Sequence, residues 1–195
     1  AFKSWSDKTG YLRGQILWRF AEMLLARQDE LAELIPNPSA SAAKKEVKIT
    51  AERIVRIAGW ADKFQQILGC ANPVSGPYHN FTLPTPIGAS VLLPPKYPPL
   101  LSMATMISNA LATGCTAVVL PSYKIGPLAC AIGEVASTSD FPNGAINILP
   151  CKSEELIETL AKHRGLKCIV ADLPKVKSHF PKVKSHFPKV KSHRP

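Results

Sequence analysis

Residues 86–150 alternate between short apolar runs and amphipathic segments, and this alternation restricts the fold more than any other feature of the sequence. Each apolar run is too short for a helix and ends directly before a proline, which indicates a buried strand. We expect these strands at residues 87–93, 115–120 and 145–149. Between them, residues 100–111 and 127–136 carry apolar side chains at helical spacing. Strands that alternate with helices in this way predict parallel pairing with right-handed crossovers.

Two long amphipathic helices are predicted ahead of this unit, at residues 8–35 and 44–68. Apolar residues recur there at helical spacing, and a proline-rich stretch followed by a small-residue linker at 39–43 separates the two helices. We expect both helices to cover one face of the sheet. Residues 78–84 alternate well enough for an extended edge strand.

A second crossover is expected after the third strand. Ser153 is a suitable N-cap for a helix with acidic residues in its first turn. Residues 167–171 then predict a fourth parallel strand. The fold class indicated is α/β, with strands and helices alternating over residues 86–172 behind two long amphipathic helices. We expect residues 1–173 to form one domain.

The carboxyl-terminal residues 174–195 repeat the heptapeptide PKVKSHF and contain seven basic residues and no acidic one. A proline in every repeat excludes a long helix, so we expect a disordered tail. The formal net charge of +10 is concentrated there, because the other 17 of the 24 basic residues accompany 14 acidic ones. Nucleic acid is therefore expected to bind only non-specifically, through residues 174–195. Repeat expansion explains the regularly spaced tail histidines better than metal binding.

The cysteines are odd in number and lack C-x-x-C spacing, so free buried thiols in a reducing compartment are favoured over disulfides or zinc. They are Cys70, Cys115, Cys130, Cys151 and Cys168. The strand around Cys115 favours a structural thiol over a nucleophile.

No apolar run reaches the ~18 residues of a membrane span, so we expect a cytoplasmic protein without membrane contact. The first residue, Ala1, suggests part of a longer chain.

Five short motifs occur in a fixed order along the chain. They are Trp5 with residues 11–17 (YLRGQIL), 58–63 (AGWADK), 86–88 (PIG), 108–114 (SNALATG) and 141–148 (FPNGAINI). Together they resemble the amino-terminal, NAD-binding half of the aldehyde dehydrogenase superfamily. The resemblance covers roughly residues 5–172. It implies a Rossmann-like parallel sheet in a truncated aldehyde dehydrogenase lobe, with NAD as the family's cofactor.

The residues that would carry activity in that family depart from its pattern. Tyr97 occupies the place of the asparagine that helps to form the oxyanion hole. Leu120 and Tyr123 stand where the family has a lysine and a glutamate that bind the adenosine ribose. Asp172 follows the fourth strand where the family has a G-S-x-x-x-G turn, and the catalytic half is missing. No catalytic residue or metal ligand is identified. The vestigial cofactor positions are Pro95, Lys96, Tyr97, Leu120, Ser122 and Tyr123.

Three functions from different classes remain open. The first is a degenerate, non-catalytic module that serves packing or assembly with a fuller aldehyde dehydrogenase domain or within a homo-oligomer, and that binds no cofactor. With its substituted working residues, the chain is most similar to the degenerate second domain of the two-domain, family-16 type of aldehyde dehydrogenase. The second is a fragment of an NAD-dependent oxidoreductase acting on aldehydes, and the third is polyanion binding through the basic tail. Substitution at several cofactor positions at once favours the first.

Overall fold

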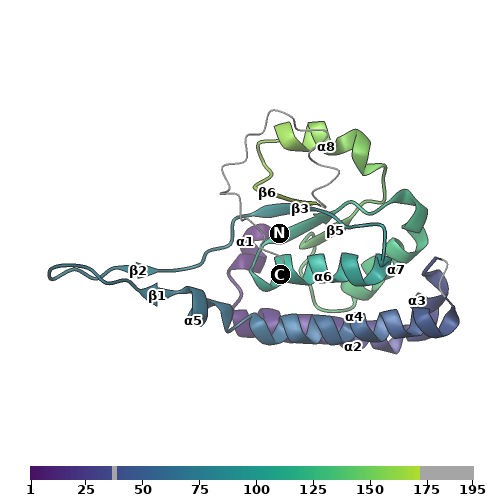
Figure 1. Ribbon diagram of the computed structural model, residues 1–195, viewed down its shortest axis with the longest axis horizontal. Coiled ribbons are helices and arrows are strands. Elements are labelled where there is room, and N and C mark those ends of the chain that lie inside the picture. The colour runs from purple at the N-terminus through teal and green to yellow at the C-terminus, as the bar shows by residue number, and fades with distance from the viewer. Residues whose placement is uncertain (37–38, 172–195) are drawn as a thin grey trace, which may run out of the picture.

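The central sheet has four parallel strands in the order β5-β4-β3-β6 (Figure 1). The computed structural model describes residues 1–36 and 39–171, so the prediction of a disordered tail at 174–195 lies outside the described residues. All four predicted strands are confirmed, each slightly shorter than its apolar run. Their bounds are Ala89–Leu93 for β3, Thr116–Val119 for β4, Ile146–Ile148 for β5 and Cys168–Ala171 for β6.

Helices cover both faces of this sheet. Helix α6 (Pro99–Ala112) connects β3 to β4, and α7 (Gly126–Ser137), preceded by a short 3₁₀ turn η1 (Tyr123–Ile125), connects β4 to β5. Both lie on one face, whereas α8 (Ser153–Lys162) crosses the opposite face and brings the chain back past β3 to β6 (Figure 1). The strand order therefore reverses between β3 and β6. Helix α8 begins at Ser153 itself with Lys152 in the N-cap position, so the cap prediction is wrong by one residue.

The amino-terminal helices form an additional layer. Helices α2 (Gly10–Ala26) and α4 (Ala40–Trp60) pack against each other and against α6, on the side away from the sheet (Figure 1). The prediction that they cover the sheet directly is wrong, because α6 and α7 already cover that face. The long helices bury their apolar sides on the crossover helices instead.

Neither long helix has the predicted bounds. The segment 8–35 is divided into α2 and α3 (Gln28–Leu34) by a non-helical backbone at Arg27, and a further short helix, α1 (Phe2–Ser6), precedes it. The segment 44–68 is also divided, into α4 and α5 (Phe64–Leu68). Helix α4 starts inside the predicted linker because the Ser39 hydroxyl accepts a hydrogen bond from the Ala42 N–H at 3.3 Å.

Residues 78–84 do not form an edge of the main sheet. Strand β2 (Phe81–Thr82) instead pairs antiparallel with β1 (Cys70–Ala71) in a separate two-stranded ribbon that projects from the body (Figure 1). The Asn72 side chain stabilises the ribbon by donating to the side-chain oxygens of Asn80 and Thr82, each at 3.0 Å. The prediction of a strand at 78–84 is confirmed only at Phe81–Thr82, and its assignment to the main sheet is wrong.

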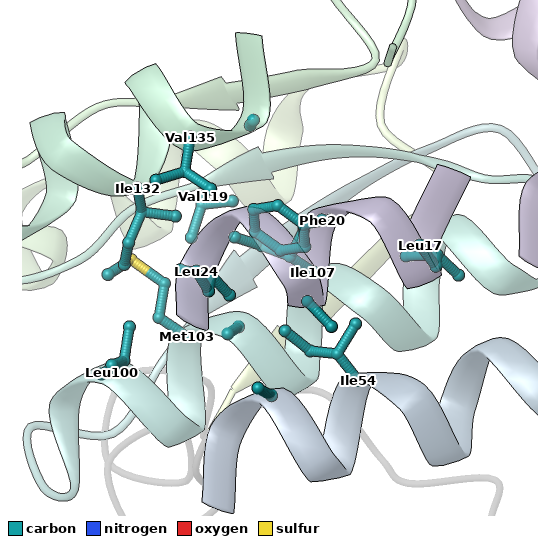
Figure 2. Packing of buried hydrophobic residues seen from close by; sticks show 14 of the residues in the cluster. Leu17, Phe20, Leu24, Ile54, Leu100, Met103, Ile107, Val119, Ile132 and Val135 are labelled. Atoms are coloured by element: carbon teal, nitrogen blue, oxygen red, sulfur yellow. The ribbon is translucent and has the colours of Figure 1, made fainter. Parts of the chain in front are cut away.

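Two apolar cores result from this layering. The larger lies between the sheet, α6, α7 and the amino-terminal helices (Figure 2). A smaller core on the opposite face, under α8, contains Val91, Leu93, Leu120 and Ile157. The labelled side chains of the larger core in Figure 2 are Leu17, Phe20, Leu24, Ile54, Leu100, Met103, Ile107, Val119, Ile132 and Val135.

Side chains from the first 13 residues close the carboxyl end of α6. The indole Nε1 of Trp5 donates to the Leu111 carbonyl at 3.0 Å, and the guanidinium Nε of Arg13 donates to the Ala112 carbonyl at 3.1 Å. Both side chains are buried. The last carbonyls of a helix have no partner within it. Arg13 therefore satisfies the Ala112 carbonyl, and Trp5 adds a second donor to the Leu111 carbonyl, which also accepts from the Gly114 N–H at 2.9 Å.

Candidate functional site

The candidate site lies at the carboxyl ends of β3 and β4, near the point where the strand order reverses. Open α/β sheets bind ligands at this edge. The segment after β3 contains Pro95, Lys96 and Tyr97, and the segment after β4 contains Leu120 to Tyr123. Because β3 and β4 are parallel neighbours, both segments leave the sheet at the same edge. The fold therefore brings the two predicted groups of cofactor positions to one side of the molecule.

The segment after β3 is open to solvent. Tyr97 is 72% exposed, Lys96 is also exposed, and Pro95 is half-buried. Within the described residues, neither the phenol of Tyr97 nor the ammonium of Lys96 makes a hydrogen bond or ion pair that fixes its direction. A phenol whose direction no hydrogen bond fixes does not offer the positioned donor that a developing oxyanion requires.

Glu46 occupies the amino end of α6, directly after this segment. Its carboxylate accepts hydrogen bonds from the backbone N–H groups of Leu100 at 2.9 Å and Leu101 at 3.1 Å. A helix amino terminus after the first strand of such a sheet is a common place for a phosphate. In this chain the donors at that place are taken by the protein's own carboxylate. Glu46 was missed in the sequence, because nothing near it indicates a partner 54 residues away.

One of the predicted positions after β4, Leu120, has its side chain in the small core. Leu120 is only 3% exposed and packs with Val91, Leu93 and Ile157 under α8. Ser122 is half-buried, and its hydroxyl accepts a weak hydrogen bond from the Lys124 N–H at 3.5 Å. The Tyr123 side chain is exposed. Of the predicted positions after β4, Tyr123 alone is therefore exposed, at 53%.

Cys151 is the thiol nearest to this segment, because it forms an isolated parallel bridge with Ser122 and its carbonyl accepts from the Tyr123 N–H at 3.1 Å. Burial, with a smaller contribution from the charge of Glu155, raises the pKa of the Cys151 thiol. The thiol therefore stays protonated at neutral pH, which is the inert form. The sequence pattern gave no reason to select this cysteine.

The other cysteines divide by location. Cys115 is buried, which agrees with the structural role predicted from its strand, and Cys168 is half-buried. Cys70 and Cys130 are exposed, so the prediction of buried thiols is wrong for these two. Cys70 lies on the projecting ribbon and Cys130 on the outer side of α7, where no core forms.

Neither a metal cluster nor a membrane-spanning helix is found among the described residues. In the ranges 1–36 and 39–171, no three His, Cys, Asp or Glu side chains lie close enough together to hold a metal ion. No helix in those ranges combines the length and the apolar character needed to cross a membrane.

Comparisons with known proteins give a consistent result. The model of the aldehyde dehydrogenase family matches residues 1–171. DhaS of Bacillus subtilis, named as an aldehyde dehydrogenase, is 31% identical over 167 residues, which are 83% of this chain and 33% of DhaS. Retinal dehydrogenase 2 of Gallus gallus is 30% identical over 166 residues, which are 83% of this chain and 32% of that protein.

The solved structures agree with the sequence comparisons. PnpE in complex with nicotinamide adenine dinucleotide superposes with a TM-score of 0.80 at 28% identity, over 87% of this chain and 35% of PnpE. The chain spans about a third of the length of these relatives. Because the family model covers all of the described residues in the order that the fold requires, this chain belongs to the aldehyde dehydrogenase family and corresponds to its amino-terminal, Rossmann-like part.

Proposed function

We propose that this chain is a non-catalytic, aldehyde-dehydrogenase-like module that associates with a fuller aldehyde dehydrogenase domain or with another subunit in the cytoplasm. The observation that carries the proposal is the burial of Leu120. By resemblance this residue stands at the place of a ribose-binding lysine, and here it is an apolar member of the core under α8. The leucine side chain has no polar atom that could bind a cofactor.

Two further features of the candidate site support the loss of NAD binding. Glu46 takes the N–H donors at the start of α6, and its charge disfavours a second anion there. Tyr97 and Lys96 are not held in a fixed direction by any described residue. NAD is the cofactor of relatives such as PnpE, whose structure contains it, but the described residues of this chain do not fit it. The turn after β6 lies outside the described residues.

The association part of the proposal is supported by the β1–β2 ribbon. The ribbon and its flanks expose Val74, Tyr78, Phe81 and Leu83 at a distance from both cores. Exposed apolar side chains grouped on a projecting element are typical of a protein–protein interface. A two-stranded ribbon is also marginally stable alone, and a partner would stabilise it.

The alternative of an NAD-dependent oxidoreductase fragment is separated from this proposal by calorimetry. We expect no heat of NAD binding below millimolar cofactor, because the loss of a charged hydrogen bond costs roughly 1.5 to 3 kcal/mol for each lost contact. We also expect no aldehyde-dependent formation of NADH. The aldehyde dehydrogenase of Bacillus cereus, which has been solved as an NAD+ complex, is the positive control. Micromolar NAD binding by the unmodified chain contradicts the non-catalytic proposal.

The association is tested by size-exclusion chromatography of the chain mixed with DhaS or alone. We expect a complex that is lost in the double variant Tyr78→Ser with Phe81→Ser, because these changes remove the exposed aromatic side chains of the ribbon. Polyanion binding through residues 174–195 stays a prediction from the sequence, since the structure does not describe them.

A further inference from the structure

Asn143 and Gly144 form an asparagine–glycine pair in the turn that joins α7 to β5 (Figure 1). It is the only such pair in the sequence. The turn is closed by a hydrogen bond of 3.0 Å from the Ala145 N–H to the Pro142 carbonyl. Gly144 has a φ of 78°, a left-handed conformation that glycine adopts in a turn without strain. Both residues of the pair are exposed.

The reactive groups of this pair are not occupied by other contacts. Apart from its closing bond, the turn is held by the Asn147 side chain, whose Nδ2 donates to the Gly144 carbonyl at 3.0 Å. Among the described residues, neither the Gly144 N–H nor the Asn143 side-chain amide takes part in a hydrogen bond. Glycine also has no side chain to hinder the approach of its nitrogen to a neighbouring carbonyl carbon. A bond from the Gly144 nitrogen to the side-chain Cγ of Asn143 closes a five-membered ring.

We propose that Asn143 is a site of spontaneous deamidation, with water as the only co-reactant. The Gly144 nitrogen forms a bond to Cγ of Asn143, and the bond from Cγ to Nδ2 breaks. Nδ2 takes the proton of the Gly144 N–H and leaves as ammonia. Water then adds to either carbonyl of the cyclic imide and opens the ring, which gives aspartate or isoaspartate. This inference goes beyond the proposed function and involves neither the ribbon nor the candidate cofactor positions.

The other described asparagines are each restrained by their surroundings. Asn109 lies within α6 and Asn147 within β5, where regular hydrogen bonds fix the backbone. Asn72 precedes a proline, whose nitrogen carries no hydrogen to release. Asn80 precedes a phenylalanine, and its side-chain oxygen accepts from the Asn72 amide at 3.0 Å. Asn143 differs from all four both in its following residue and in its freedom from contacts.

Isoaspartate at position 143 would disturb the start of β5. It adds one carbon atom to the backbone of the turn, whereas aspartate adds none. Ala145, two residues further on, is fully buried, and its carbonyl accepts from the Ala117 N–H at 2.9 Å. Ile146 pairs with Ala117 in parallel register. A longer turn strains either its closing hydrogen bond or this register, so the isoaspartate form should hold the edge strand β5 less firmly.

Mass spectrometry of the full chain, aged in mildly alkaline buffer, tests the reaction. Trypsin releases residues 125–152 as one peptide, which carries Asn143 together with Asn147 as an internal control. We expect amide-to-carboxyl exchange at Asn143 at least about tenfold faster than at Asn147, and within about tenfold of the rate in a free peptide of the same sequence. An unaged sample gives the background. Equal rates at the two asparagines, or a folded chain more than about tenfold slower than the peptide, overturn the proposal.

Two variants separate the modification from its effect on β5. Asn143→Gln cannot close the five-membered ring, so after the same ageing it should keep the urea midpoint of the fresh parent. Asn143→Asp supplies the aspartate product with an unchanged backbone, and freshly prepared it should keep that midpoint too. The aged parent should unfold at lower urea concentration as its isoaspartate content rises, which labelling by an isoaspartyl methyltransferase measures. An aged parent that contains isoaspartate and is as stable as aged Asn143→Gln overturns the effect on β5.

Discussion

Glu46 and Leu100, 54 residues apart, are joined by a 2.9 Å hydrogen bond from the Leu100 N–H to the glutamate Oε1. Pro98 occupies the N-cap position of α6 and offers no side-chain acceptor, so the cap of this helix comes from α4. The carboxylate also complements the positive end of the α6 dipole. The amino end of α6 is therefore stabilised by a residue that lies in a different layer of the fold.

The Glu46→Ala substitution should lower the free energy of unfolding by about 1 to 3 kcal/mol, because two backbone donors lose a charged acceptor. Glu46→Gln keeps an acceptor and should cost less. Urea denaturation measures both. Glu52→Ala, an exposed position on the same helix, is the control and should change stability by less than about 0.5 kcal/mol. A Glu46→Ala variant as stable as the parent would show that the cap contributes nothing to stability.

Trp5→Phe should destabilise the chain by about 0.5 to 1.5 kcal/mol, since the buried Leu111 carbonyl loses its indole donor but keeps the Gly114 N–H, and most of the apolar contact is kept. Trp18→Phe provides the comparison, because Trp18 is half-exposed and its side chain makes no hydrogen bond among the described residues. Equal losses in the two variants would argue against the hydrogen bond.

Gly14→Ala and Gly59→Ala should shift stability in opposite directions. The Cβ at position 14 would approach the Ala58 carbonyl oxygen to 2.8 Å and push α2 from α4, which should cost about 1 to 3 kcal/mol. At position 59 the Cβ meets open space within a helix, so alanine should add about 0.5 to 1 kcal/mol. Thermal unfolding of both variants decides, and a shared sign would contradict the described helix contact.

Leu120→Lys should unfold the chain more readily without creating a cofactor site. The lysine would enter the small apolar core under α8 beside Val91, Leu93 and Ile157, at a cost of at least about 2 to 4 kcal/mol. Leu120→Met, which nearly conserves volume, should cost less than about 1.5 kcal/mol. The same calorimetric titration shows whether NAD binds. Even with Tyr97→Asn added, we expect no turnover, and any NADH formed would refute this.

The free energy of unfolding should fall at alkaline pH in part because of Cys151. Its folded thiol has a pKa above the ordinary value near 9.0, so the folded state favours the protonated form. The stability from this preference is fully present below the pKa of the unfolded thiol and is lost as the pH rises through the folded value. Cys151→Ala should therefore show a shallower decline of the free energy of unfolding above about pH 9 than the parent, and an unchanged slope would contradict this role of Cys151.

The strands and crossover helices were predictable because their signals are local. Each apolar run between residues 87 and 149 ends at a proline. Each intervening helix carries apolar side chains that recur at helical spacing. The ribbon was not predictable in this way, since β1 is two exposed residues without periodicity. The break at Arg27 and the position of α2 and α4 on α6 depend on contacts between residues far apart in sequence.

The sequence predicted at which edge of the sheet the candidate positions lie, but only for some of them whether the side chain is exposed or buried. The strand pattern puts Tyr97 and Tyr123 at the carboxyl edge, and the structure finds both exposed there. The inward direction of Leu120 follows from alternation along β4, in which Val119 faces the large core while Val118 and Leu120 face the small one. That period of two was available in the sequence. The cap by Glu46 was not, since it requires the tertiary fold.

The side chains at the two ends of α6 also set a constraint on biosynthesis. Trp5, Arg13 and Glu46 leave the ribosome before residues 100–112, to which the backbone groups that they bind belong. Helices α2 and α4 therefore emerge with the surface that later covers α6 still uncovered. A nascent chain that ends before residue 112 cannot complete the larger core, so translation first produces an aggregation-prone helical pair that must wait for its central helix.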